Sequence, residues 1–340
     1  DDIRLVSRHP QKINDSDVTV SANLLDAGQT QNAVNGSDTV YFTADEAKEF
    51  SSDLNGKFEG IGAELGKTEG RLTILSVIGD SPAQNAGLQA KDIIYKVNDE
   101  ETAKMTVSDA VKKIRGEKGT SVKLSIVRGG TGKDYTIVRD SITNPSVKSE
   151  VLNDGVGYMR ITRFGDDTSS LARKAAQDFK GQNVSKVVLD LRGNGGGLLS
   201  AARDVSSLWL KDKVVVSERT NGVTTDTLRS ESSPILSGVK TVVLVDGGSA
   251  SASEIVAGAL KDNGAATLVG EKTFGKGSVQ TVENLAGGAE LKVTIARWYT
   301  PLGKNINKEG IMPDKVVALS EDDVKAGRDP QKDAALAALR

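Results

Sequence analysis

Apolar residues recur with two different periods along the chain, and the change of period divides it into parts. Between residues 58 and 139, short segments of alternating polarity lie between glycine turns, which is typical of strands exposed on one face. From residue 155 onward, continuous apolar runs of strand length alternate with segments of helical spacing. The pattern predicts an N-terminal segment at 1–56, a small domain at 57–140 and a larger domain at 141–340.

The small domain is expected to contain strands, one short helical turn and one longer helix. Ser81 and Pro82 have the residue types of an N-cap and a first helical position, and Gly87 is expected to stop that turn. A glycine loop at 58–65 leads into a first strand. Further strands are predicted at 72–78, 92–98 and 122–127, the last of these closing the domain, and a helix is predicted at 107–114.

The larger domain repeats the order strand, then helix. Strands are predicted at 157–161, 186–191, 241–246 and 266–270, with helices at 169–179, at 198–210 and from the serine-rich segment to Lys261. The strands at 279–285 and 290–299 are expected to pair as a hairpin. Because helices that connect consecutive strands favour parallel pairing, the order predicts an α/β fold with a largely parallel core.

The N-terminal segment carries less information. Residues 1–37 are polar and weakly periodic, so we expect loosely ordered chain or short helices there. A threonine followed by acidic residues predicts a short helix at 43–50. The chain opens on two aspartates without a recognisable signal peptide, and we expect a processed or trimmed fragment.

Composition narrows the chemistry. The chain has one histidine, His9, and no cysteine, so a Ser-His-Asp triad, a Cys-His pair and a His/Cys metal centre are nearly excluded. The net charge of -2 gives no reason to expect nucleic acid as a partner, and no apolar run is long enough to span a membrane. We expect no cofactor and no metal. Any nucleophilic chemistry would need a lysine as its base.

Ser251 lies where an apolar helix is expected to begin. With Glu254 it fits a capping box, in which the serine side chain bonds the backbone N–H three residues on. The same position would direct the hydroxyl outward and leave the Ala252 N–H facing an oxyanion near the positive end of the helix dipole. From the spacing alone the capping interpretation is the stronger of the two.

Lys276 lies between two glycines in the segment after the next strand. Most lysines are solvated, but these glycines would permit a tight loop that holds the amine away from water. A lysine in that situation can act as a general base near neutral pH. Gln280 could orient the amine, and Lys272 is a rival base without flanking glycines. The glycine run 195–197 is either a plain turn or a second source of oxyanion donors, in particular Gly196 or Gly197.

The phrases Gly60-Ile61-Gly62-Ala63, Ser81-Pro82-Ala83 and Ala86-Gly87-Leu88, with the order of elements around them, resemble a PDZ domain. One departure is Lys91, where the family commonly has glycine before the aspartate. The resemblance implies that the backbone N–H groups of Ile61, Gly62 and Ala63 receive the carboxylate of a substrate tail, which adds as a strand. The alternative for Gly60 to Gly62 is a simple glycine turn.

The segments 189–197, 251–254 and 273–280 together resemble the carboxy-terminal processing proteases, serine peptidases related to tail-specific protease. The step from Ser251 to Lys276 and the preceding PDZ domain match that family. The resemblance implies a ClpP/crotonase-like core. It also implies Ser251 as nucleophile, Lys276 as base and Gln280 as the residue that orients the base. Ala252 and one of Gly196 and Gly197 would form the oxyanion hole.

The resemblance therefore implies a serine endopeptidase that cleaves proteins or peptides near their free C-terminus after the PDZ domain has recognised the tail, and that is located outside the cytoplasm. Arg115, which ends the PDZ helix, is a candidate for coupling tail binding to the core, although a cation there also satisfies the helix dipole. Members of the family usually carry helices near the N-terminus that pack or dimerise, followed by a turn with a proline. Residues 37–41 lack that proline, so the resemblance leaves open whether the chain forms an oligomer. Competing hypotheses are an inactive PDZ-based peptide-binding scaffold and a crotonase-like thioester enzyme, which would leave the PDZ domain unexplained.

Overall fold

The computed structural model describes residues 3–4, 19–20, 40–220 and 222–340. The chain divides into two compact units, one of Asp1–Leu54 with Ser146–Arg340 and the other of Asn55–Pro145. Near the N-terminus, β1 (Ile3–Arg4) pairs antiparallel with β2 (Thr19–Val20). Otherwise the expectations for residues 1–37, including His9, lie outside the described residues.

The central sheet of the larger unit has the strand order β12-β13-β14-β17-β18-β21. Its members are β12 (Val147–Val151), β13 (Gly157–Ile161), β14 (Lys186–Asp190), β17 (Lys240–Val245), β18 (Thr267–Gly270) and β21 (Lys315–Val316). From β13 to β21 each strand is parallel to its neighbour, and β12 pairs antiparallel at the edge. The prediction of a largely parallel α/β core is confirmed, although β12 and β21 were not anticipated.

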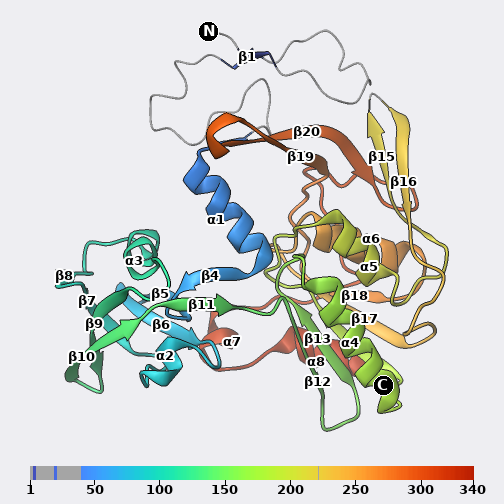
Figure 1. The fold of residues 1–340 in the computed structure, drawn as a ribbon. Coiled ribbons are helices and arrows are strands. Elements are labelled where there is room, and N and C mark those ends of the chain that lie inside the picture. The colour runs from blue at the N-terminus through green and yellow to red at the C-terminus, as the bar shows by residue number, and fades with distance from the viewer. Residues whose placement is uncertain (1–2, 5–18, 21–39, 221) are drawn as a thin grey trace. The chain divides into compact units, whose positions relative to one another are not determined.

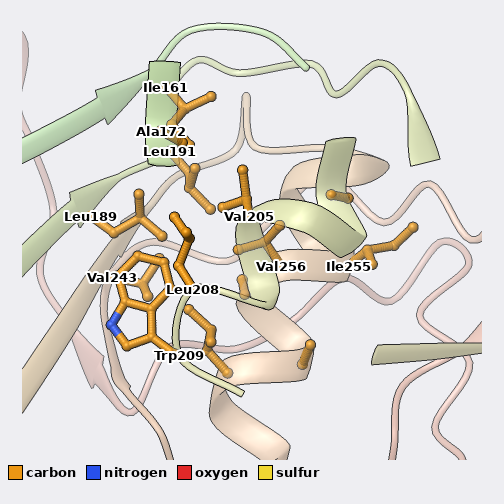
Figure 2. Close-up of a cluster of buried hydrophobic side chains, with 14 of the residues drawn as sticks. Ile161, Ala172, Leu189, Leu191, Val205, Leu208, Trp209, Val243, Ile255 and Val256 are labelled. Carbon is orange, nitrogen blue, oxygen red and sulfur yellow. The ribbon is translucent and has the colours of Figure 1, made fainter. Parts of the chain in front are cut away.

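Apolar side chains fill both faces of this sheet. Along β14, Val187 and Leu189 point into one cluster of buried side chains, whereas Val188 between them joins a second cluster. The first cluster lies under α4 (Thr168–Gly181), α5 (Leu199–Ser206) and α6 (Ala252–Asp262), as Figure 2 shows for side chains of β14, α5 and α6. On the other face, α8 (Pro330–Ala338) contributes to the second cluster. Burial on both faces explains the continuous apolar runs in these strands.

The helix α5 is shorter than predicted. The helix expected at 198–210 ends at Ser206. The hydroxyls of Ser206 and Ser207 donate to the carbonyls of Ala202 and Arg203, four residues earlier, and the chain then turns. Such bonds compete with continued helix, which the apolar spacing could not reveal.

A second sheet in the larger unit has the order β16-β15-β20-β19, with β3 (Val40–Phe42) also paired to β20. The hairpin of β19 (Ser278–Asn284) and β20 (Glu290–Tyr299) was predicted and is confirmed, with the short 3-10 helix Ala286–Gly288 in its turn. The strands β15 (Val214–Thr220) and β16 (Val223–Arg229) were missed. The helix predicted at 43–50 is α1 (Ala44–Asn55), and α7 (Glu321–Lys325) precedes α8 (Figure 1).

The smaller unit contains a sheet of order β10-β9-β7-β6-β5, with β8 (Glu100–Glu101) attached to β7. The other strands are β5 (Ala63–Thr68), β6 (Arg71–Val77), β7 (Ile93–Val97), β9 (Ser121–Arg128) and β10 (Thr131–Val138). The predicted helices α2 (Pro82–Asn85) and α3 (Val107–Ile114) are confirmed, and Ser81 caps α2 as expected. The expectation that the strand at 122–127 closes the unit is wrong, because β10 pairs with it and β11 (Asp140–Thr143) then pairs with β4 (Lys57–Gly60).

Candidate active site

Three loops meet at one edge of the central sheet. The strands β14, β17 and β18 are consecutive and parallel, so their carboxyl ends lie at the same edge. Residues 191–198, here called the glycine loop, follow β14. Residues 246–251, the serine segment, follow β17, and residues 271–277, the lysine loop, follow β18. Ligand sites in open α/β sheets form at this edge. The topology thus brings together segments that are up to about 80 residues apart in sequence.

Ser251 occupies a strained turn at the start of α6. Its φ is 53° and its ψ is -115°, a conformation that side chains with a Cβ rarely adopt. Gly196 lies against this turn, since a Cβ added to it would stand 2.7 Å from Ser251 Cβ and 2.8 Å from the Ala250 carbonyl oxygen. A strained turn of this kind exposes the nucleophilic serine of α/β-hydrolases.

The lysine loop packs closely on neighbouring backbone at both glycines that flank Lys276. A Cβ added to Gly275 would stand 2.9 Å from the Gly310 nitrogen, and one added to Gly277 would stand 2.7 Å from the Asn307 nitrogen. Gly275 also has a φ of 94°. Between them, Lys276 is half-buried, and its carbonyl oxygen accepts a hydrogen bond from the Trp298 indole at 3.0 Å. The backbone of Lys276 is therefore fixed against β20.

One buried carboxylate joins the serine turn to the lysine loop. Glu254 is fully buried, and its Oε2 accepts the backbone N–H groups of Ser251 and Lys276, each at 2.9 Å. Its Oε1 accepts the Thr273 hydroxyl at 2.5 Å and the Gly275 N–H at 2.8 Å. The bond to Ser251 is one half of a capping box, whereas the sequence interpretation had named the other half, from the Ser251 side chain to the backbone N–H of Glu254. The three bonds to the lysine loop were missed, because no local spacing signals a contact across about 20 residues.

These residues line one cavity of about 460 Å³. Its wall includes every residue proposed from sequence for the reaction: Gly196, Gly197, Ser251, Ala252, Lys276 and Gln280. Apolar side chains from α5, α6 and the second sheet form much of the rest, namely Leu198, Leu199, Val216, Ile255, Val279, Val282 and Trp298. Lys272, the rival base, is exposed and does not line this cavity. The arrangement favours Lys276 over Lys272 as the partner of Ser251.

Charged groups also border the cavity. The side chains of Arg163, Glu218 and Lys292 contribute to its wall. Burial and the nearby Asp226 carboxylate raise the pKa of Glu218. A cavity with a mainly apolar wall and a few charged groups suits a peptide better than a highly charged ligand.

The glycine loop is bonded to the serine segment. Asp246 Oδ1 accepts the Gly193 N–H at 2.9 Å, and the Asn194 carbonyl accepts both the Ala250 N–H and the Ser253 hydroxyl. The Gly196 N–H donates to Asn194 Oδ1 at 2.9 Å. The Gly196 N–H therefore already has an acceptor, and it could donate to an oxyanion only after releasing Asn194 Oδ1.

An ion-pair network anchors the base of the glycine loop. Arg192 bonds the fully buried carboxylate of Asp190 at 2.7 Å and that of Asp329, just before α8, at 2.8 Å. Tyr158 donates to the same Asp190 carboxylate at 2.6 Å. Burial and the Asp190 carboxylate raise the pKa of the Tyr158 hydroxyl, which stays protonated. Asp190 and Arg192 thereby fix the direction in which the loop leaves β14.

In the smaller unit, the predicted tail-binding segment lies between β4 and β5. β5 is an edge strand, and α3 packs beside it. The Ile61 carbonyl accepts the Ala83 N–H, and the Gly62 carbonyl accepts the Ile78 N–H. Since a trans peptide directs its N–H opposite to its carbonyl, the N–H groups of Gly62 and Ala63 point away from these partners. This is the arrangement that a carboxylate would need, and an edge strand beside a helix can pair with an extended peptide.

Gly62 lies within this segment, and Arg115 reaches it from the end of α3, since a Cβ added to Gly60 would stand 3.7 Å from Arg115 Cγ. Gly62 has a φ of 78°, and a Cβ there would meet Ser81 Cβ at 2.4 Å. Arg115 caps α3, and its guanidinium lies over the Phe58 ring, 4.9 Å from the centroid. That contact accounts for its position within the smaller unit, and its coupling to the core stays a prediction.

No group of three or more His, Cys, Asp or Glu side chains within the described ranges could hold a metal ion. In the same ranges, no helix is both long and apolar enough to cross a membrane.

Comparisons with known proteins agree with this geometry. Residues 155–317 match the model of peptidase family S41, and residues 73–128 match that of the PDZ domain. The carboxy-terminal-processing protease of Bartonella bacilliformis is 38% identical over 301 residues, covering 84% of this chain and 69% of the relative. The carboxy-terminal processing protease CtpA of Bacillus subtilis is 38% identical over 277 residues, covering 81% of this chain and 59% of the relative.

A solved structure supports the same assignment. The photosystem II D1 C-terminal processing protease is 30% identical and has a TM-score of 0.53, covering 82% of this chain and 78% of that one. The chain spans 56–59% of the length of the first curated relatives it matches. The sequence match and the shared architecture lead to one conclusion: the chain belongs to peptidase family S41, the family of the carboxy-terminal processing serine proteases, and carries a PDZ domain.

Proposed function

We propose that the protein is a serine endopeptidase that uses a Ser251–Lys276 dyad and cleaves protein substrates after its PDZ domain has bound their C-terminal tail. The observation that carries this proposal is the single cavity lined by Ser251, Lys276 and Gln280. An inactive scaffold would not need a strained serine turn, an enclosed lysine loop and a glutamine at one wall. A thioester enzyme would leave the PDZ domain without a role.

In the first half of the reaction, Ser251 Oγ attacks the carbonyl carbon of the scissile peptide and its proton passes to Lys276 Nζ. The oxyanion forms hydrogen bonds with the Ala252 N–H at the positive end of α6 and with a second N–H from the glycine loop. That donor is Gly197, or Gly196 once it releases Asn194 Oδ1. The C–N bond then breaks, and the lysine returns the proton to the leaving amine.

In the second half, a water molecule attacks the acyl-enzyme ester. Lys276 takes the proton of the water and returns it to Ser251 Oγ as the ester bond breaks, which releases the new carboxyl terminus and restores the starting state. Gln280 orients the lysine amine throughout. No metal ion or organic cofactor takes part in these steps.

The smaller unit supplies substrate selection in this proposal. The N–H groups of Ile61, Gly62 and Ala63 receive the terminal carboxylate, and the tail pairs with β5 beside α3. Gly60 and Gly62 allow the backbone to approach, and Arg115 couples tail binding to cleavage. An Arg115→Ala variant with unchanged kinetics on both tailed and tail-less substrates would remove the coupling.

The test uses an unfolded polypeptide that ends in small apolar residues, and the same polypeptide with its C-terminal carboxylate converted to an amide. We expect cleavage of the first, much slower cleavage of the second, no cleavage by Ser251→Ala, and no effect of a chelator. Turnover by Ser251→Ala at the wild-type rate would refute the enzyme assignment. Equal rates on the acid and the amide would refute tail recognition only.

We also propose an extracytoplasmic location, which is supported by family resemblance. Fractionation of the producing cells tests it, and recovery of the protein in the cytosol alone would contradict it.

A further inference from the structure

Ser278 carries a buried hydroxyl that has no hydrogen-bond partner among the described residues. It is the first residue of β19, is 8% exposed and lines the cavity that contains Ser251 and Lys276. Among the described residues, three buried side-chain polar atoms have no partner: Arg219 Nε, Ser278 Oγ and Thr300 Oγ1. Of these, only Ser278 contributes to the cavity wall.

A buried hydroxyl that makes no hydrogen bond destabilises the folded protein, because it has lost its bonds to water. An alanine at position 278 would avoid that penalty. Native proteins leave few such groups, and a catalytic role is one reason for keeping one. Hydrogen bonds used in catalysis are often long or absent until substrate is bound. The missing partner of Ser278 therefore points to a contact that forms in the working enzyme.

The amine of Lys276, the proposed base, has N–H bonds that need hydrogen-bond acceptors. A neutral lysine amine has one lone pair and two N–H bonds. When the lone pair points at the Ser251 hydroxyl, both N–H bonds require acceptors at the wall of the cavity. Gln280 Oε1 can accept one of them. Ser278 and Gln280 are two residues apart on β19, and both line the same cavity.

We propose that Ser278 is a positioning residue whose Oγ accepts a hydrogen bond from the Lys276 amine during catalysis. This inference rests on the proposed function. With both N–H bonds engaged, the lone pair has one remaining direction, toward Ser251 Oγ. After proton transfer the ammonium has three N–H bonds, which go to Ser278, to Gln280 and to the nitrogen of the leaving group. Ser278 itself neither gains nor loses a proton.

The test compares Ser278→Ala with Ser278→Thr in the peptidase assay on the unfolded polypeptide. Because Ser278 acts through the lysine and not on the substrate, the alanine variant should lower kcat by about 10- to 100-fold, the loss typical of a hydrogen bond to a charged group, with KM unchanged. The threonine variant, which keeps the hydroxyl, should restore most of kcat. Loss of the unpartnered hydroxyl should leave the Tm of the alanine variant equal to or above that of the wild type.

Thr300 offers a matched control. It is also buried, and its hydroxyl also has no partner among the described residues, but it does not line the cavity. Thr300→Val keeps the shape of the side chain and removes the hydroxyl. It should affect the Tm in the same direction as Ser278→Ala and leave kcat unchanged. A fall in activity specific to position 278 would then come from the site and not from removal of a buried hydroxyl in general.

Three results would overturn the inference: a wild-type kcat in Ser278→Ala, an equal loss in Ser278→Thr, or a change confined to KM. Ser251→Ala separates these from failure of the proposed function. If Ser251→Ala is inactive and Ser278→Ala behaves as the wild type, only the role of Ser278 is refuted. If Ser251→Ala retains turnover, the proposed function fails and the role of Ser278 fails with it.

Discussion

The backbone nitrogens of Ser251 and Lys276 donate to the same oxygen atom, Glu254 Oε2, each at 2.9 Å. The two nitrogens are therefore within about 6 Å of each other, although the residues are 25 positions apart in sequence. The carboxylate also holds the N–H of a serine in a strained conformation. One buried side chain, Glu254, therefore links the backbones of the proposed nucleophile and the proposed base.

Glu254→Gln tests that link. An amide has one acceptor oxygen, so its NH₂ group would face one pair of the donors that Glu254 now satisfies. We expect kcat to fall by about 100-fold and the free energy of unfolding to fall by about 2 kcal/mol. Steady-state kinetics and urea unfolding measure the two effects. Glu283→Gln makes the same charge change at an exposed position of β19 and should alter neither. Wild-type kcat in Glu254→Gln would show that the carboxylate is only structural.

The glycine loop provides a second prediction. A Cβ at Gly196, whose φ is 104°, would stand 2.7 Å from Ser251 Cβ and 3.0 Å from the Ala252 nitrogen. Gly196→Ala should therefore displace the serine turn and lower kcat/KM by at least about 100-fold. Gly195 has no atom within 4 Å of an added Cβ and no positive φ, so Gly195→Ala should lose far less. Equal losses in the two variants would argue against the close packing of Gly196 on Ser251.

The smaller unit should lose stability in acid through Asp92. Burial alone would raise the pKa of Asp92, but hydrogen bonds from Arg128 and from the Gln89 N–H outweigh it and hold the pKa below its usual value. Because the folded-state pKa is the lower one, the stabilisation is present above about pH 4 and is lost as the pH falls through the folded-state pKa.

The size of this contribution is about 1–3 kcal/mol at neutral pH, as for other hydrogen bonds between charged groups. Asp92→Asn should lower the Tm of the smaller unit at pH 7, and the difference from the wild type should shrink by pH 3. Scanning calorimetry of the whole chain at both pH values measures this. A difference that stays constant with pH would contradict the assignment.

The left-handed backbone conformation of Lys91 leads us to predict that a glycine at this position stabilises the protein. Lys91 stands where PDZ domains commonly have glycine, and its φ is 74° with an exposed side chain. A left-handed conformation costs a residue with a Cβ about 1–2 kcal/mol, part of which the greater entropy of an unfolded glycine offsets. Lys91→Gly should gain about 0.5–1 kcal/mol in chemical unfolding. Lys91→Ala, which keeps a Cβ, should gain nothing, and an equal gain would trace the effect to the lysine side chain instead.

The sequence predicted the elements whose signals are local. The strand Lys186–Asp190 and the helix Val107–Ile114 were found because burial on both faces and helical spacing leave plain patterns. Strand β16 was missed because it is mostly polar and largely exposed, and β15 was missed although it opens on three valines. Strand β10 was missed for the same reason as β16, since it is mostly polar and depends on pairing with β9.

In the candidate site, too, residues with local motifs were predicted from sequence and contacts between distant segments were not. Ser251, Lys276 and Gln280 were identified from motifs, and the structure brings them to one cavity. The bonds from Glu254 to the lysine loop and the contact of Trp298 with the Lys276 carbonyl were not foreseen. These contacts depend on the order of strands in the sheet and on the packing of β20, which residue spacing alone does not determine.

The measurement that tests the central claim most directly is turnover of the tailed, unfolded polypeptide by Lys276→Met and Lys272→Met. Both variants replace an amine with an apolar side chain of similar length, four positions apart in the same segment. The proposed base predicts that Lys276→Met loses at least about 1000-fold in kcat while Lys272→Met keeps wild-type activity. Normal turnover by Lys276→Met, with or without loss in Lys272→Met, would contradict a Ser251–Lys276 dyad.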